Sequence, residues 1–314
     1  MGSPLVVDRN VVIVGAGAVG ASLAAQLVAC EQNRVFFAAG PERRRRLQER
    51  QLRVNDAPLD VDVLPLEKPA FDVDLLILTV KSLHLTQALA DIEPLVGADT
   101  TILSMLNGIE SEEQIAARYG WERTLYGYVV GIDATRSGSE IRALSQGRFV
   151  FGRASNEAVE PRVALTRDIL ERAGVTCEVP ADMIRQLWWK FMVNVGINPL
   201  SAILRAPYGV FQQSDEAHAL MNQAMEEVLP LASAEGVRLD EDDVTGWHGI
   251  LSGLDPTGQT SMLQDVVAGR PTEVDIFCGA VSRLGRKHGI PTPLNDTMGR
   301  MLAAIESQFK CDAS

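Results

Sequence analysis

Near its N-terminus the chain reads Val11-Val12-Ile13-Val14-Gly15-Ala16-Gly17-Ala18-Val19-Gly20. The first four residues form a short apolar β-branched run, which is typical of a strand buried on both faces of a sheet. A GxGxxG pattern follows at once, and the apolar residues as far as Cys30 then favour a helix. Between a strand and a helix, such glycines permit a tight turn and let a pyrophosphate approach the helix N-terminus. The segment therefore predicts a dinucleotide site, and the alternative is a glycine-rich turn of some other α/β protein.

Strands and helices are predicted to alternate through the rest of the first half. Apolar strand-like runs occupy residues 35–38, 75–80 and 101–105, and helical segments occupy residues 43–51, 85–92 and 111–119. This order predicts an α/β fold with a doubly wound, Rossmann-type parallel sheet. Ligands of such sheets bind at the carboxyl ends of the strands. Lys81 and Asn107-Gly108 follow two of the predicted strands and are expected to face the ligand, although a solvated helix start and a simple turn are the alternatives.

The end of the second strand bears on the choice between NAD and NADP. An acidic residue there would hold the ribose 2′-hydroxyl of NAD, whereas nearby arginines accommodate the 2′-phosphate of NADP. The strand ends Ala38-Ala39-Gly40-Pro41, no acid precedes Glu42, and the run Arg43-Arg44-Arg45-Arg46 comes next. We expect Arg43 or Arg44 to meet a 2′-phosphate, and the alternative is a solvated helix face.

A polar stripe lies in the apolar segment Leu187-Trp188-Trp189-Lys190-Phe191-Met192-Val193-Asn194-Val195-Gly196-Ile197-Asn198-Pro199-Leu200. At about 3.6 residues per turn, Lys190, Asn194 and Asn198 fall on one face of a helix that is apolar elsewhere and is expected to be buried all round. A buried ammonium and two buried amides cost several kcal/mol unless something satisfies them, and a polar ligand would do so. A structural ion pair with two amides bonded to the backbone is the alternative.

From residue 181 onward the chain is predicted to be helical, so the expected domains are a nucleotide-binding domain over residues 1–180 and a helical substrate domain over residues 181–314. Six helices are expected, over residues 183–194, 199–204, 215–235, 260–268, 273–288 and 295–308. Ser261 and Glu273 stand out because each places a polar group beside apolar residues at a helix start. Both could instead be ordinary first-turn residues, favoured at that end of a helix.

Composition narrows the classes of function. The chain has 314 residues and a net charge of −12, which disfavours nucleic acid and anionic membrane surfaces as partners. Its four cysteines are scattered without a CxxC pair or metal-like spacing to the histidines, as expected for reduced thiols of a cytoplasmic protein that holds no metal. Residues 11–30 carry no charge and mimic a signal peptide, but Asp8 beside Arg9 and the glycine pattern argue against that interpretation.

The chain resembles the ketopantoate reductases (2-dehydropantoate 2-reductases) from Val11 to about Met298. The motifs that carry the resemblance are the glycine segment, Val80-Lys81-Ser82, Asn107-Gly108, the stretch from Lys190 to Leu200, Ser261-Met262-Leu263-Gln264-Asp265 and Thr272-Glu273-Val274-Asp275. The lysine–asparagine stripe followed by the serine and glutamate segments is much more specific than the glycine segment alone.

The resemblance implies a Rossmann domain, a helical second domain like that of 6-phosphogluconate dehydrogenases, and NADPH-dependent reduction of ketopantoate to pantoate in pantothenate biosynthesis. By this resemblance Lys190 is the catalytic acid, and Asn194, Asn198 and Ser261 bind the substrate. Glu273 is the second catalytic residue, at the junction of the active site and the cofactor. Its carboxylate is expected to support Lys190 by opposing the fall in pKa that burial causes in the ammonium. The residues implied to bind the cofactor are Gly15, Ala16, Gly17, Ala18, Val19, Gly20, Arg43, Lys81, Asn107, Ala134 and Glu273.

Three positions depart from the family pattern. Leu106 stands where many members have glutamine, Gly40 where an arginine often ends the second strand, and Tyr208 where some members have another substrate-binding asparagine. The Tyr208 difference leaves open a related dehydrogenase acting on another 2-keto or 3-hydroxy acid. A non-catalytic NADPH-binding regulator is a further alternative, but it would not need the lysine–asparagine stripe. A homodimer is compatible with the sequence, which does not decide the number of chains.

Overall fold

The computed structural model describes residues 8–311, with the side chains of residues 8–309. Residues 1–7 and 312–314, which the two predicted domains include, lie outside the described part. The chain divides into two compact units between Met183 and Ile184.

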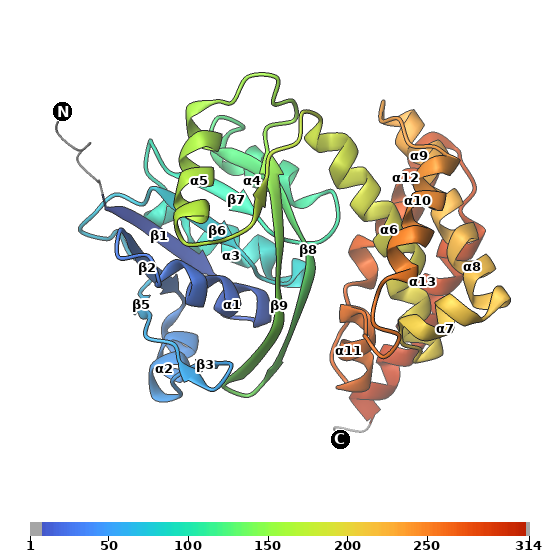
Figure 1. Cartoon of the computed structure of the whole chain (residues 1–314), viewed down its shortest axis with the longest axis horizontal. Helices are drawn as coiled ribbons and strands as arrows, with labels where there is room; N and C mark the ends of the chain where they lie inside the picture. The colour runs from blue at the N-terminus through green and yellow to red at the C-terminus, as the bar shows by residue number, and fades with distance from the viewer. Residues whose placement is uncertain (1–7, 312–314) are drawn as a thin grey trace. The chain divides into compact units, whose positions relative to one another are not determined.

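The first unit is built on one ten-stranded sheet (Figure 1). Along the sheet the order is β4-β3-β9-β8-β7-β6-β1-β2-β5, and β10 pairs with β9 outside this path. The pairs from β5 through β2, β1, β6 and β7 to β8 are parallel, whereas β8 and β9 form a long antiparallel hairpin. The strands are β1 (Arg9–Val14), β2 (Asn33–Ala38), β3 (Arg53–Val54), β4 (Ala57–Pro58), β5 (Asp62–Leu64), β6 (Leu75–Leu78), β7 (Thr101–Ser104), β8 (Thr124–Ser137), β9 (Glu140–Gly152) and β10 (Cys177–Glu178).

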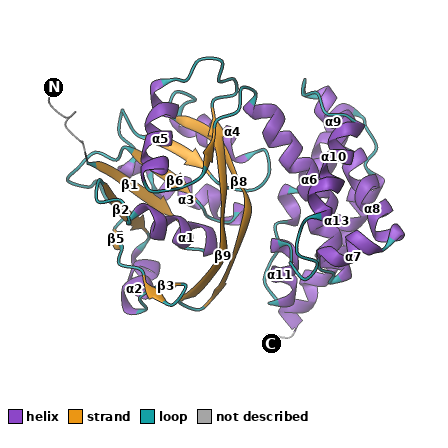
Figure 2. Ribbon diagram, viewed as in Figure 1, coloured by secondary structure: helices purple, strands orange, loops and turns teal. Residues whose placement is uncertain are grey.

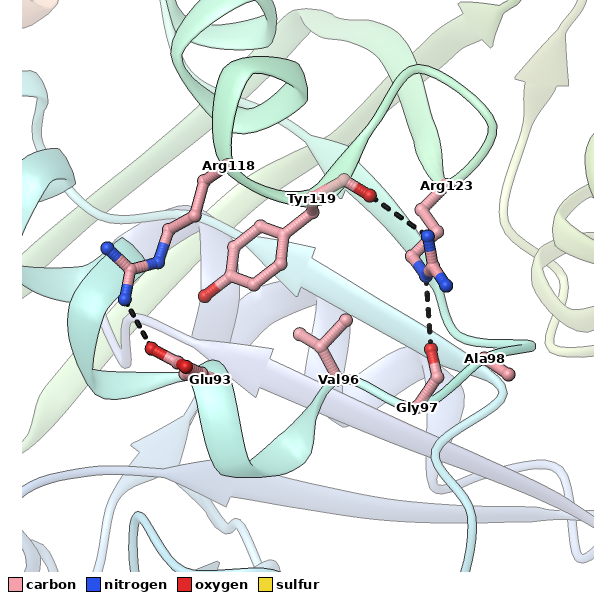
Figure 3. A pocket seen from close by; sticks show the side chains of 7 residues that line it. All are labelled: Glu93, Val96, Gly97, Ala98, Arg118, Tyr119 and Arg123. Carbon is pink, nitrogen blue, oxygen red and sulfur yellow. Dashed lines mark hydrogen bonds and ion pairs between the residues drawn. The ribbon is translucent and has the colours of Figure 1, made fainter.

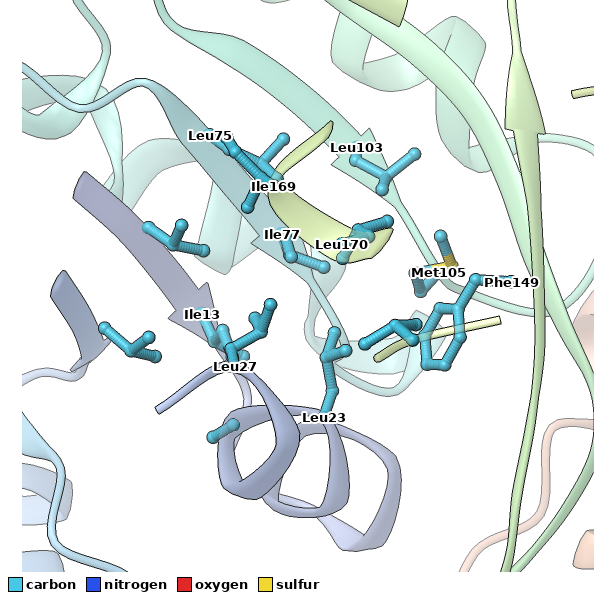
Figure 4. Packing of buried hydrophobic residues seen from close by; sticks show 14 of the residues in the cluster. Ile13, Leu23, Leu27, Leu75, Ile77, Leu103, Met105, Phe149, Ile169 and Leu170 are labelled. Carbon is cyan, nitrogen blue, oxygen red and sulfur yellow. The ribbon is translucent and has the colours of Figure 1, made fainter. Parts of the chain in front are cut away.

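Helices cover both faces of this sheet, so its central strands are buried on two sides. Side chains alternate between the faces along a strand: Val11 and Ile13 join a core beneath α1 and α5, whereas Val12 and Val14 join a core beneath α3 and α4. Figure 4 shows the first of these cores. The helices of the unit are α1 (Ala18–Leu27), α2 (Pro41–Glu49), α3 (Leu85–Asp91), α4 (Ser111–Tyr119) and α5 (Pro161–Arg172), with short 3₁₀ turns η1 (Ser82–His84) and η2 (Glu93–Leu95).

The second unit is helical throughout its described part (Figure 2). Its long helix α6 is fully buried from Phe191 to Ala202 and packs against α8, where Gly196 leaves room for Met225. The helices are α6 (Met183–Leu204), which starts at the last residue of the first unit, α7 (Tyr208–Gln213), α8 (Asp215–Glu226), α9 (Val228–Ala234), α10 (Glu241–Ser252), α11 (Ser261–Val267), η3 (Val274–Ile276), α12 (Cys278–His288) and α13 (Pro293–Cys311).

The predicted fold class, a Rossmann-type α/β part followed by a helical part, is confirmed. Several details differ from the prediction. The helix predicted over residues 215–235 is divided into α8 and α9, and the one predicted over residues 273–288 is the turn η3 followed by α12. The sheet is mixed because the β8–β9 hairpin extends it, and α6 runs through Pro199 where we expected a break. Proline removes one backbone hydrogen bond and crowds the carbonyl four residues earlier, but burial of the surrounding apolar residues holds the helix together. Among residues 8–311, no helix is long and apolar enough to cross a membrane.

Candidate functional site

The glycine segment forms the connection between β1 and α1. Gly15 has a φ of +117°, and a Cβ there would lie 2.7 Å from the backbone carbonyl of Thr79, which follows β6. A Cβ at Gly20 would overlap the carbonyl oxygen of Gly15. The Thr79 hydroxyl donates to that same oxygen at 2.7 Å. The fold itself therefore requires Gly15 and Gly20, and Thr79, which we did not predict, fastens the turn to the neighbouring strand.

Gly17 differs from these two glycines. Its backbone is extended, with φ of −77° and ψ of −170°, and a Cβ would meet no protein atom within 4 Å. Gly17 is the N-cap of α1 and supplies no capping side chain, so the first amides of the helix, beginning at Ala18 and Val19, are left for another partner. An open face beside free helix amides suits an anion such as a pyrophosphate. The residues present therefore fit the dinucleotide predicted from the sequence.

Other predicted cofactor residues also lie at the carboxyl ends of the parallel strands. Strands β2, β1, β6 and β7 are parallel neighbours, so the connections that follow them all start at the carboxyl ends of the strands, on one side of the sheet. Arg43 lies on α2 after β2, Lys81 precedes η1 after β6, and Asn107 follows β7. Ala134 is a half-buried residue of β8, where a bulge shifts the register with β9. In the first unit, the predicted residues that follow β2, β6 and β7 therefore lie on the same side of the sheet as the glycine segment.

The polar stripe of the second unit lies on α6 as predicted. Lys190, Asn194 and Asn198 are four residues apart on this unbroken helix. Asn194 is 5% exposed and Asn198 is 7% exposed, among apolar residues that are almost entirely buried. Burial lowers the pKa of the Lys190 ammonium from 10.5 to about 8 and is the only cause of this shift.

Two groups of the stripe have no protein partner. Within the described part of the chain, neither the Lys190 ammonium nor the Asn198 amide forms a hydrogen bond or ion pair. The expected effect of the Glu273 carboxylate on the pKa of Lys190 is not found, because burial is the only cause of the shift and no hydrogen bond or ion pair joins the two side chains. Lys190 is half-buried, and the polar atoms of Lys190 and Asn198 are not among the described side-chain atoms that are sealed from solvent without a partner. A lysine and an asparagine that stay open to solvent on one face of an otherwise apolar helix indicate a ligand site.

Ser261 and Glu273 lie at turns of the same unit. Thr260 caps α11 by accepting a hydrogen bond from the amide of Leu263 at 3.1 Å, and the exposed Ser261 is the first residue of that helix. Glu273 is 8% exposed and precedes η3. Its neighbour Thr272 donates from both its amide and its hydroxyl to Glu306 of α13, at 2.8 and 2.5 Å. Glu306 therefore fixes the backbone that presents Glu273.

A cavity of about 490 Å³ elsewhere in the first unit is a poor candidate for the site (Figure 3). It is lined by residues that precede β7 and β8, including Gly97 and Arg123, so it opens at the amino ends of the strands. Ligands of doubly wound sheets bind at the carboxyl ends of the strands instead. Its charged residues also satisfy one another or the backbone, as Arg118 does with Glu93 and Arg123 with the carbonyl of Gly97.

Comparison with known proteins relates both units of the chain to one family. The family model described as Ketopantoate reductase PanE/ApbA matches residues 11–156, and that described as Ketopantoate reductase PanE/ApbA C terminal matches residues 182–306. The 2-dehydropantoate 2-reductase of Mesorhizobium japonicum is 28% identical in an alignment 330 residues long. The alignment covers 96% of this chain and 99% of that protein.

Two solved structures have the same fold over nearly the whole chain. A PanE/ApbA family ketopantoate reductase from Ralstonia eutropha has a TM-score of 0.82 at 26% identity, covering 96% of this chain and 100% of its own. D-mandelate dehydrogenase in complex with NADH has a TM-score of 0.86 at 25% identity, with the same coverage of both chains. Since the two family models together span most of the sequence, the chain belongs to the ketopantoate reductase family.

Proposed function

We propose that this oxidoreductase reduces 2-dehydropantoate (ketopantoate) to pantoate with NADPH, a step of pantothenate biosynthesis. The stripe formed by Lys190, Asn194 and Asn198 carries the proposal. It places one acid and two amides on a single buried helix, and two of these three groups lack a protein partner. A small acid that carries a ketone, a carboxylate and a hydroxyl offers each of them a complementary group.

Lys190 is proposed as the proton donor. NADPH, when bound, supplies a hydride to the carbonyl carbon, and negative charge then develops on the carbonyl oxygen. An ammonium next to that oxygen stabilises the transition state more than the neutral ketone. With a pKa of about 8, Lys190 is largely protonated at neutral pH and gives up its proton more readily than an exposed lysine.

The remaining polar groups are proposed to orient the substrate. Asn194 and Asn198 can each donate and accept hydrogen bonds, which suits the hydroxyl and carboxylate of a 2-keto acid. Ser261 offers a hydroxyl at the start of α11. We propose that Glu273 lies beside both the substrate and the cofactor, and the hydrogen bonds from Thr272 to Glu306 hold its backbone in place.

A second candidate function is the reduction of another 2-keto acid. The similarity to D-mandelate dehydrogenase favours it, because that enzyme has the same fold at 25% identity. Tyr208, the first residue of α7, also replaces a substrate-binding asparagine of some family members. Measuring kcat/KM for ketopantoate, for aliphatic 2-keto acids and for aromatic 2-keto acids separates the two candidates. A clear preference for an aromatic acid would reject ketopantoate as the substrate.

We expect NADPH to be preferred over NADH by roughly ten- to a hundredfold in kcat/KM, the range for charge-assisted hydrogen bonds worth about 1.5–3 kcal/mol. Two observations support this preference. No acid ends β2, and Glu42, the first acid after it, pairs with Arg46 at 3.3 Å. The exposed Arg43 is nearby on α2. Parallel assays with both cofactors measure the ratio, and equal values or a preference for NADH would contradict it.

The pH dependence of catalysis should report the pKa of Lys190. Because reduction needs the protonated ammonium, kcat/KM for the keto acid should be level below about pH 8 and fall tenfold per pH unit above it. Oxidation of the alcohol product needs the neutral amine and should show the opposite slope. Rates in both directions between about pH 6 and pH 10 test this expectation. A reduction profile that stays level through pH 9 would show that another group supplies the proton.

A further inference from the structure

The four consecutive arginines of α2 are not equivalent in the structure. Three of them are engaged with other groups: Arg44 Nε donates to the carbonyl of Val63 at 3.0 Å, Arg45 pairs with Glu49 at 3.8 Å, and Arg46 pairs with Glu42 at 3.3 Å. Arg43 is exposed, and no residue among 8–309 forms a hydrogen bond or ion pair with its side chain. Of the two arginines proposed from the sequence to meet a phosphate, Arg43 is therefore the one available.

A fifth arginine reaches the same region from far along the chain. Arg136 lies near the end of β8, and its guanidinium donates from Nη1 to the carbonyl oxygen of Ala16 in the glycine segment. Its Nε donates to the carbonyl of Gly138 at 2.8 Å. No carboxylate in the described part of the chain pairs with it, and Nη2 has no partner there. Burial lowers the pKa of the Arg136 guanidinium, and the positive charge of Arg43 lowers it further.

The fold holds these two cations together. The β8–β9 hairpin is tied to β3, since Arg53 and Val54 of β3 pair with Glu140 and Ile141 of β9. Arg136 is the register partner of the same Ile141. Figure 1 shows the tip of this hairpin beside β3. Through Arg136 the tip reaches the glycine segment, and Arg43 lies on the helix that follows β2, near which a Rossmann sheet receives the adenosine ribose.

Two neighbouring cations without an acid repel one another, and the half-buried position of Arg136 adds a desolvation cost. A dianionic ligand between them would remove both penalties, and a guanidinium fork matches the oxygens of a phosphate. We propose that Arg136, together with Arg43, binds the 2′-phosphate of NADPH. The two side chains would take the role of the arginine that often stands in the family where this chain has Gly40. This inference rests on the proposed NADPH-dependent function and names the residues that give the preference.

The other role for Arg136 is to hold the glycine segment or to contact the pyrophosphate. NADH shares that segment and that pyrophosphate with NADPH but has no 2′-phosphate. Dissociation constants for the two cofactors therefore separate the roles without any measurement of turnover. The fragments 2′,5′-ADP and 5′-AMP repeat the comparison with the smallest ligands that differ in this phosphate.

We would measure these constants by fluorescence titration and calorimetry for the wild type, Arg136→Met, Arg43→Met, the double variant and Arg136→Lys. Arg45→Met is the matched control, because it removes an exposed arginine of the same helix that pairs with Glu49 instead. Arg136→Met and Arg43→Met should each weaken NADPH and 2′,5′-ADP about ten- to a hundredfold. Affinity for NADH and 5′-AMP should change by less than about twofold, which also shows that the variants are folded. Arg136→Lys should fall in between.

Equal weakening of NADPH and NADH by Arg136→Met would overturn the inference and assign Arg136 to the glycine segment. Unchanged NADPH affinity in that variant would overturn it as well. Both outcomes leave the proposed function intact if the wild type prefers NADPH. A wild type that binds NADH as tightly as NADPH would instead reject the cofactor assignment itself, and this inference with it.

Discussion

Replacing Lys190 by alanine is expected to lower kcat for the proposed reduction of ketopantoate by roughly 10²–10⁴, the range for lost general-acid catalysis. Affinity for NADPH should change little, because the cofactor residues proposed above, apart from Glu273, lie in the first unit. The fold should survive, since Lys190 pairs with no described carboxylate and its removal strands no opposite charge. Single-turnover rates with saturating NADPH, set beside the melting temperature, measure both consequences.

The purely structural interpretation of Lys190 predicts the reverse result, lost stability with near-normal kcat in the folded fraction. Lys190→Met sharpens the comparison because it keeps most of the side-chain volume and removes only the charge. At neutral pH the ammonium is charged in the folded and unfolded chains, so its burial opposes folding. That penalty disappears as the pH rises from the folded pKa of about 8 toward the unfolded value of 10.5. Lys190→Met should therefore be inactive without a lower melting temperature at pH 7.

Lys287→Ala is the control for this pair of variants. Lys287 is an exposed lysine of α12 that forms an ion pair with Glu235, away from the polar stripe of α6. Its loss should leave kcat unchanged. An active but destabilised Lys190→Ala protein would overturn the mechanism, whatever the control showed.

The parts of the fold that could be predicted are those set by local pattern. Strands β1, β2, β6 and β7 are nearly continuous apolar runs, because both faces of each are covered, and each prediction overlaps the strand found. The polar stripe of α6 was visible for the same reason, as three polar residues at helical spacing in an apolar segment. Helices α5, α7 and α10 were not predicted, and the capping box of Asp240 and Asp243 is the signal that could have found α10.

The parts that could not be predicted depend on contacts between distant residues. Hairpin β8–β9 is half exposed along much of its length, so it lacks the apolar run by which a buried strand is recognised. Its role at the glycine segment rests on one hydrogen bond between residues 120 positions apart, from Arg136 to Ala16. The sequence predicts that an arginine of α2 meets a phosphate. Only the structure shows which of these arginines already bond to other protein groups, and that Arg136 is a further candidate beside Arg43.

Gly17→Val is expected to abolish detectable NADPH binding while leaving a folded protein. The added side chain would meet no protein atom within 4 Å at its Cβ, and the φ of −77° suits any residue, so the free energy of unfolding should change little. The same open space is where a pyrophosphate must come close to the backbone at the start of α1. Two extra methyl groups there would keep the phosphates away from the helix amides. Titration with NADPH, together with circular dichroism and the melting temperature, measures both effects.

A comparison with Gly20→Ala tests whether the two glycines really differ in role. At Gly20 even one methyl group would overlap the carbonyl oxygen of Gly15 and lie 2.5 Å from the Thr79 hydroxyl. Gly20→Ala should therefore lower the melting temperature, whereas Gly17→Val should lower affinity alone. If Gly17→Val binds NADPH normally, the glycine segment serves only to turn the chain, and the cofactor must be held by other residues. If both variants unfold alike, the space beside Gly17 is needed by the protein rather than by its ligand.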